Sequence, residues 1–431
     1  MSHRAPLVPE PAGTRGGDTS PAAAFDLVLL GSGLGVYTLA RAFHEQYGVV
    51  ATVVTKVGIE PMLRSVACEV IELGGAASDT DLIEELRRLA AERGERRTQL
   101  LLANSDALIQ LMSDHRAELS PYYVMPILEA DVLERLSDKA DFAQLCTENG
   151  VATPRTEVID LSGTPQPGGV PSATSIPFPL VMKAARTADM AGVRFAGKKK
   201  VWFIADQDEL TELVRSIEQA GYTGRLVVQE LIPGDDTAEG SITAYTDSAG
   251  RVTLLCSARV LLGEHTPDAL GRPAAMITTP FEDALDQARR LLEVTGYRGF
   301  ANFDLKRDPR DGTWTFFEVN PRIGRNNFYV SAAGANIARF VVADVIEHRE
   351  IEPVTQFDEI LYSLVPMPLL LRYVRDPALK RWVRTVARRG VRNPWTYPAD
   401  GRWARRYARI VALNHVRKFL RHYPRPTDSG F

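Results

Sequence analysis

The stretch "FFEVNPRIGRNN", Phe316–Asn327, combines two strand-forming aromatic residues with an acid, amides and two arginines. Glu318 and Asn320 are two residues apart, so in a strand their side chains point to the same side of the sheet. Together they offer oxygen atoms of the kind that Mg²⁺ prefers as ligands. The simpler alternative is a polar strand end that enters a turn. The rest of the chain has to decide between these two interpretations.

The residues before this stretch predict the partner strand. The segment "GFANFDLKRDPRDGTWTFFEVN", 299–320, is typical of a hairpin that turns at Asp-Gly, 311–312. Asp304 lies on the first strand and Glu318 on the second, and antiparallel pairing can bring them close on one face. Two carboxylates so close repel each other unless a cation lies between them. We therefore predict that Asp304, Glu318 and Asn320 hold Mg²⁺ or Mn²⁺.

Length and composition exclude several other classes of protein. The chain has 431 residues, enough for two or three domains, and its hydrophobic fraction of 45% is ordinary for a globular protein. Cys68, Cys146 and Cys256 are far apart, which argues against a disulfide framework or a zinc site and fits a reducing cytoplasm. No apolar run approaches the roughly 18 residues that span a bilayer. Residues 1–24 are rich in Pro, Gly and Ala, and we predict a disordered tail.

The ordered part opens with a βαβ pattern in "FDLVLLGSGLGVYTLARAFHEQYGVVATVV", which predicts a parallel sheet. A dinucleotide site is not predicted, because Val36 occupies the sixth position of the glycine fingerprint. Thr55 and Lys56 also stand where its acidic residue is expected. We therefore assign the glycines of this loop to helix–strand packing. The expected elements are strand 25–30, helix 34–46, strand 49–54, a helix near 79–93 and strand 99–103.

The middle of the chain carries residues suited to phosphates. Lys183 ends the apolar strand "FPLVMK", and Lys139 begins a predicted helix. Either lysine alone is more often a plain surface residue. The glycine-bearing loop 187–200 can fold over phosphates and offers backbone N–H groups together with Lys198–Lys200. In "VVQELIPGDD" a strand leaves its sheet, which exposes backbone groups that can read a purine edge.

These pieces, in this order, resemble the ATP-grasp superfamily of carboxylate–amine ligases over roughly residues 25–350. The resemblance implies an α/β and α+β fold, with a Rossmann-like domain over 25–130 and an ATP-grasp domain over 131–350. Two α+β subdomains of the latter would clamp ATP. The roles that it implies are phosphate contacts for Lys139 and Lys183, an adenine pocket of Gln229, Glu230, Leu231 and Ile232, ribose binding by Asp236, and metal binding by Asp304, Glu318 and Asn320.

Within the superfamily, "GKKKVWFI" and "EVNPRIGRNNFYVSAAGANIAR" resemble the D-aspartate ligase group. That resemblance implies an ADP-forming ligase that joins an acidic amino acid to an amine of a peptidoglycan precursor through an acyl phosphate. We assign Arg322 to the acyl oxygen, Arg325 to a substrate carboxylate, with a plain salt bridge as its alternative, and Asn302 to the same catalytic set. Three alternatives stay open: a dipeptide ligase, another carboxylate-activating ATP-grasp enzyme, and a silent nucleotide-binding regulator.

Residues 351–431 form a basic C-terminal extension. Residues 372–431 hold 16 Lys or Arg and three Asp or Glu, a net charge of +13 in a chain whose net charge is −3. We predict one helix between Asp376 and Gly390 and a second over about 402–422. Either both helices pack on the body, or they meet an anionic membrane or a phosphate-bearing precursor; no motif for nucleic acid is present. Their predicted apolar faces comprise Leu379, Trp382, Val383 and Val386, and Trp403, Tyr407, Ile410 and Val411.

Overall fold

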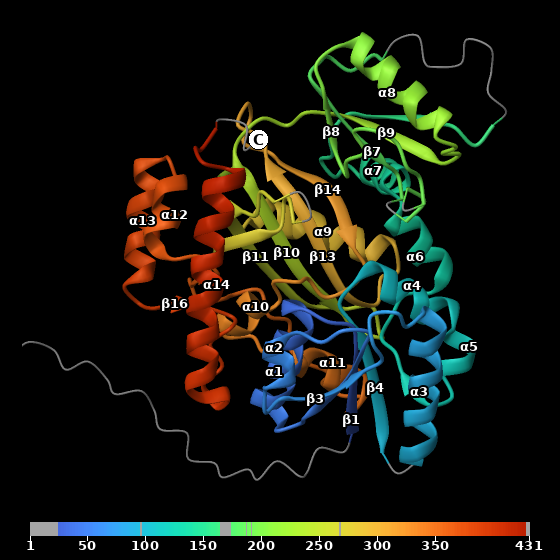
Figure 1. Ribbon diagram of the computed structural model, residues 1–431, viewed down its shortest axis with the longest axis vertical. Helices are drawn as coiled ribbons and strands as arrows, with labels where there is room; N and C mark the ends of the chain where they lie inside the picture. Colours follow the sequence, from blue (N-terminus) through green and yellow to red (C-terminus); the bar gives the residue numbers. More distant parts are fainter. Residues whose placement is uncertain are drawn as a thin grey trace, which may run out of the picture.

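The structure is a computed structural model that describes residues 25–94, 97–163, 174–186, 188–190, 192–266 and 269–427. The predicted tail, 1–24, lies outside these ranges, as do residues 187 and 191 of the predicted phosphate loop. Three sheets organise the described chain (Figure 1). This mixture of α/β and α+β layers agrees with the predicted fold class.

The N-terminal domain is a five-stranded parallel sheet in the order β3-β2-β1-β4-β5. Its apolar strands are covered on both faces, which is the arrangement that parallel sheets require. The predicted strand 25–30 and helix 79–93 are confirmed to the residue as β1 and α3. The elements are β1 Phe25–Leu30, α1 Leu34–Tyr47, β2 Ala51–Thr55, α2 Glu60–Leu63, β3 Cys68–Glu72, α3 Asp79–Arg93, β4 Thr98–Ala103, α4 Asp106–Asp114, α5 Arg116–Leu119 and β5 Tyr123–Val124.

A small antiparallel sheet, which we call the lid, follows in the order β6-β9-β7-β8. It projects from one end of the molecule, with α8 on its outer side (Figure 1). The lid has its own apolar core, built by residues of its strands and of α8. Its elements, with the two helices that lead into it, are α6 Ala130–Ser137, α7 Lys139–Glu148, β6 Thr156–Asp160, β7 Leu180–Ala184, β8 Trp202–Ile204, α8 Gln207–Gln219 and β9 Arg225–Glu230.

The largest sheet has seven strands in the order β14-β13-β10-β11-β12-β15-β16. Helix α9 covers one face, where its apolar side shares a core with the alternate residues of β10, β13 and β14. The predicted hairpin is confirmed as the antiparallel pair β13 and β14. The elements are η2 Asp236–Ala238, β10 Glu239–Thr246, β11 Val252–Gly263, β12 Pro273–Thr278, α9 Glu282–Val294, β13 Gly299–Arg307, β14 Trp314–Asn320, α10 Phe328–Ala332, α11 Ala338–Val345, β15 Leu361–Ser363 and β16 Val391–Arg392.

The C-terminal extension packs along one side of the molecule, and α14 runs beside α12 and α13 (Figure 1). Both predicted helices are confirmed, and Asp376 caps the first by accepting a hydrogen bond from the Ala378 N–H. The apolar face of α13 is buried, whereas Ile410 of α14 was assigned wrongly, because its side chain is 64% exposed. The elements are α12 Met367–Tyr373, α13 Pro377–Ala387, η3 Pro398–Asp400 and α14 Gly401–His422.

Candidate functional site

The predicted acids lie at the edge of the large sheet. Asp304 on β13 stands directly opposite Glu318 on β14, and Asn302 stands opposite Asn320. The residues between them point the other way and pack under α9. Since side chains alternate along a strand, all four polar side chains share the face away from α9. The structure therefore brings the predicted metal ligands together.

Lysines from two other elements converge on Glu318. Lys139, the first residue of α7, places its Nζ 3.3 Å from Glu318 Oε2. Lys183 on β7 of the lid lies with its Nζ 5.8 Å from the centre of the Phe317 ring. Burial raises the pKa of Glu318, but the positive charges of Lys139, Lys183 and Lys200 outweigh burial and lower that pKa to about 2. Glu318 is therefore ionised at any physiological pH.

Burial also shifts the pKa values of Asp304 and Lys183. Burial and the charge of Glu318 raise the pKa of Asp304 to about 7. Burial, together with the neighbouring Lys139 and Lys200, lowers the pKa of Lys183 to about 8, although Glu318 opposes that change. Three cationic side chains thus face two half-buried acids across the junction of lid and large sheet. Such an arrangement is suited to an anionic ligand that arrives with a cation of its own.

The amides and Arg322 form a network around Asp304. Asn320 Nδ2 donates to Asp304 Oδ2 at 2.9 Å, and Asn302 Nδ2 donates to Asp304 Oδ1 at 3.2 Å. Arg322 Nη2 donates to Asn320 Oδ1 at 3.0 Å. The same guanidinium also holds both oxygens of Asp106 from α4, at 2.8 and 3.1 Å. Arg322 thereby ties the large sheet to the N-terminal domain, a link that the sequence did not indicate.

The donor set fits a hard cation only in part. Two facing half-buried carboxylates, with a raised pKa at Asp304, match a site that a cation would neutralise. The amide of Asn320 directs its nitrogen at Asp304, however, and would have to turn over to offer its oxygen. Within the described ranges no group of three or more His, Cys, Asp or Glu is arranged for a metal. Asp304 and Glu318 are the residues that would hold Mg²⁺, with Asn320 as a third donor after that rotation.

The predicted adenine pocket is at the end of β9. Gln229 is buried and its Nε2 donates to Thr156 Oγ1 at 3.0 Å, so its side chain is turned into the lid. Glu230 forms ion pairs with Arg155 and Arg310. Beyond it the chain leaves the sheet, as predicted. Any reading of a base by this segment would therefore rely on backbone groups of Leu231 and Ile232.

Asp236 begins the short helix η2, and its side chain contacts residues at and just after the end of β11. Its Oδ2 accepts hydrogen bonds from the Gly263 N–H at 2.8 Å and lies 2.9 Å from His265 Nε2. The His265 ring stacks on Tyr423, with ring centres 3.7 Å apart and planes 8° from parallel. The residue predicted to bind ribose is thus supported by the C-terminal extension.

Arg325 is engaged in the same region. Its Nη2 donates to Glu264 Oε1 at 3.3 Å, so the salt bridge that was the alternative to a substrate contact is present. Its Nη1 is shielded from solvent and has no hydrogen-bond partner among the described residues. His415 of α14 is also buried near this pair, and burial lowers its pKa. Sequence reasoning missed Glu264 and His265, although two polar residues after a long apolar strand were a usable signal.

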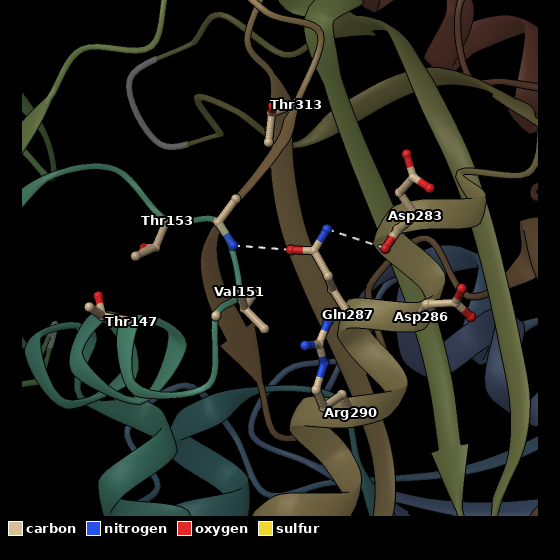
Figure 2. Close-up of a pocket in the computed structure, with 10 residues that line it drawn as sticks. Thr147, Val151, Thr153, Asp283, Asp286, Gln287, Arg290 and Thr313 are labelled. Carbon is tan, nitrogen blue, oxygen red and sulfur yellow. Dashed lines mark hydrogen bonds between the residues drawn. The ribbon is translucent and has the colours of Figure 1, made fainter.

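An open hollow of about 700 Å³ lies elsewhere, between the α7–β6 connection and α9 (Figure 2). Gln287 spans it, accepting from the Ala152 N–H at 3.0 Å and donating to the Asp283 carbonyl at 3.2 Å. Because α9 covers the opposite face of the β13–β14 hairpin, this hollow does not include the acids and lysines described above. It lies where the chain passes from α7 into β6, the first strand of the lid.

Comparisons with known proteins show the family and the fold. Residues 138–342 match the family described as carbamoyl-phosphate synthase L chain, ATP binding domain. D-aspartate ligase from Enterococcus faecium is 30% identical over 92% of this chain and 96% of its own. Two solved structures share the fold. The biotin carboxylase domain of the Hydrogenobacter thermophilus 2-oxoglutarate carboxylase, in complex with MgADP, has a TM-score of 0.59 at 15% identity over 78% of this chain and 72% of its own. The L-amino acid ligase from Bacillus licheniformis has a TM-score of 0.51 at 16% identity over 74% of each chain.

Proposed function

Since the chain belongs to the ATP-grasp family of ATP-dependent ligases that form C–N bonds, we propose that it joins an acidic amino acid such as D-aspartate to an amine of a peptidoglycan precursor peptide. The observation that carries this proposal is the similarity to D-aspartate ligase along nearly the full length of both chains. The nature of the donor and of the acceptor rests on that similarity alone.

The charged side chains suit the first half-reaction. A carboxylate oxygen of the amino acid attacks the γ-phosphorus of ATP, which forms an acyl phosphate and releases ADP. Lys139 and Lys183 are proposed to neutralise the phosphoryl oxygens, and at neutral pH Lys183 is still mostly charged. Mg²⁺, when bound by Asp304 and Glu318, would supply further neutralisation of the phosphates.

The second half-reaction requires the acceptor amine and the acyl phosphate to be held in place. The acceptor amine attacks the acyl carbon, the tetrahedral intermediate expels phosphate, and the proton of the amine passes to the departing phosphate or to solvent, which leaves an amide. Arg322 is proposed to stabilise the oxygen that becomes negative, and it is preorganised for this by its two bonds to Asp106. Asn302 is proposed to hold Asp304 in place. Arg325 would hold a second carboxylate of the substrate only by exchanging Glu264 for it.

A product assay across candidate amino acids tests this proposal. The purified chain is incubated with ATP, Mg²⁺ and one amino acid at a time, with and without a soluble peptidoglycan precursor. We expect ADP and phosphate, with the highest rate when an acidic D-amino acid and the precursor are both present. AMP and pyrophosphate as products would contradict the acyl-phosphate route. ADP formation with two free amino acids and no precursor would favour the dipeptide ligase instead.

A further inference from the structure

The outward side of α14 carries an unusual combination of side chains. The two most exposed large apolar residues of the described chain are Leu413 at 66% and Ile410 at 64%, and Leu420 is 52% exposed. With about 100° between successive helix residues, these three fall within one sector of about 80°. Exposed arginines lie within that sector or about 20° beside it. We call this set the α14 outer face; it consists of Arg402, Arg406, Arg409, Ile410, Leu413, Arg417 and Leu420.

No negative charge balances this face. Helix α14 contains no Asp or Glu in its 22 residues. Within the described ranges, none of the four arginines of the outer face forms an ion pair. The opposite side of the helix is the one that holds it to the body, through buried Ala404, Ala408, His415 and Phe419. The side chains of the outer face therefore do not hold α14 to the body.

We infer that the α14 outer face docks on an anionic lipid membrane surface. A soluble phosphate-bearing molecule would account for the arginines but not for three exposed aliphatic side chains among them. A second copy of the same face would bring arginines against arginines. A lipid surface accounts for both, because aliphatic side chains enter the acyl boundary while arginines remain with the anionic headgroups. Among the described helices none is long and apolar enough to cross a membrane.

Vesicle binding tests the inference, and it does so independently of the proposed reaction. The full chain is sedimented with vesicles of phosphatidylglycerol and phosphatidylcholine, and with vesicles of phosphatidylcholine alone, over a range of salt concentrations. We expect binding to the anionic vesicles only, with release as salt rises, because surface attraction is screened. Equal binding to both kinds of vesicle, or to neither, would overturn the inference.

Paired variants identify the face. Arg406→Gln/Arg417→Gln should weaken binding about 25-fold, at about fivefold for each arginine. Leu413→Ser/Leu420→Ser should weaken it by about tenfold or more, because the apolar anchors are lost. The matched controls are Arg215→Gln/Arg290→Gln and Val57→Ser/Val294→Ser, exposed residues on other elements, which should bind as the parent chain does.

Two further readouts complete the test. ADP release in solution should be unchanged in all four variants, which shows that they are folded. If the α14 variants bind vesicles as well as their controls do, the inference fails. It also fails if duplex DNA binds more tightly than anionic vesicles at the same salt, or if the leucine variant disperses a dimer of the parent chain.

Discussion

Glu318 is the residue on which most of the site's charges act. It is ionised because Lys139 of α7, Lys183 of β7 and Lys200, which precedes β8, outweigh its burial. The same environment raises the pKa of Asp304 beside it, so one acid of the pair carries most of the negative charge. An ionised acid next to a partly protonated one is a suitable receptor for a divalent cation, since binding would also release the proton that Asp304 retains.

We predict that Glu318→Gln keeps the fold and lowers amide formation by about 10²- to 10³-fold, because the charge that faces Lys139 and the cation is lost. The measurement is ADP release at saturating ATP and Mg²⁺, with circular dichroism to check folding. Glu347→Gln serves as the control, as Glu347 pairs only with Arg349 at the surface. Turnover within a few-fold of the parent chain would remove Glu318 from the mechanism.

His415 gives a pH-dependent stability. Burial lowers its pKa below the ordinary value of 6.5, so the unfolded chain binds a proton that the folded chain resists. The unfolding free energy should therefore fall as pH decreases below 6.5, by up to about 1.4 kcal/mol per pH unit from this one group. In His415→Gln the slope of stability between pH 6.5 and 5.5 should be shallower, as measured by urea unfolding. The exposed His422→Gln is the control, and equal slopes in both variants would refute the assignment.

The acids were predictable from sequence and their supports were not, for a physical reason. Asp304 and Glu318 lie on one hairpin, where a two-residue side-chain period and a local turn determine which residues face each other. Glu264 and His265 meet Arg325 and Tyr423, and those contacts depend on how distant elements pack. Two polar residues after a long apolar strand mark this position, but no local pattern predicts which distant residues they contact.

At the scale of elements, α14 connects the extension to Asp236, the residue predicted to bind ribose. Its C-terminal end carries Tyr423 onto His265, which in turn holds Asp236. The sequence predicted α13 and α14 because caps, stops and apolar periods are local signals. It did not predict β15 and β16, because strands of two or three residues are too short to show an alternating pattern. Those two strands nevertheless join the extension to the large sheet.

We predict that Tyr423→Ala raises the KM for ATP by about three- to tenfold, the magnitude of one lost aromatic pair, with little change in kcat. The reason is that His265, released from its stacking partner, would no longer hold Asp236 for the ribose. Steady-state kinetics at varied ATP measures this split. Tyr407→Ala is the matched control, because Tyr407 stacks on Trp403 at the other end of α14. A change in kcat alone, or equal effects in both variants, would contradict the connection.

At the scale of the whole molecule, the lid and the large sheet bring opposite charges to one junction. The lid supplies Lys183 and its neighbouring loop supplies Lys200, while the large sheet supplies Asp304 and Glu318. The ion pair between Glu230 and Arg310, at 2.6 Å, ties the lid to the β13–β14 turn. A ligand that fills this junction would bind groups from both parts at once. Its binding should therefore stabilise the molecule as a unit.

ADP with Mg²⁺ at a hundred times its Kd should add about 2.7 kcal/mol to the free energy of unfolding, because it binds only the folded chain. Adenosine at the same concentration should add much less, since it lacks the phosphates that the lysines attract. In Lys183→Met the advantage of ADP over adenosine should shrink, whereas in the control Lys56→Met, whose lysine pairs with Asp79 in the N-terminal domain, it should persist. Denaturant unfolding with each ligand measures the difference. If adenosine stabilises the parent chain as much as ADP does, the lysines at this junction do not bind phosphate, and the nucleotide must be sought elsewhere on the molecule.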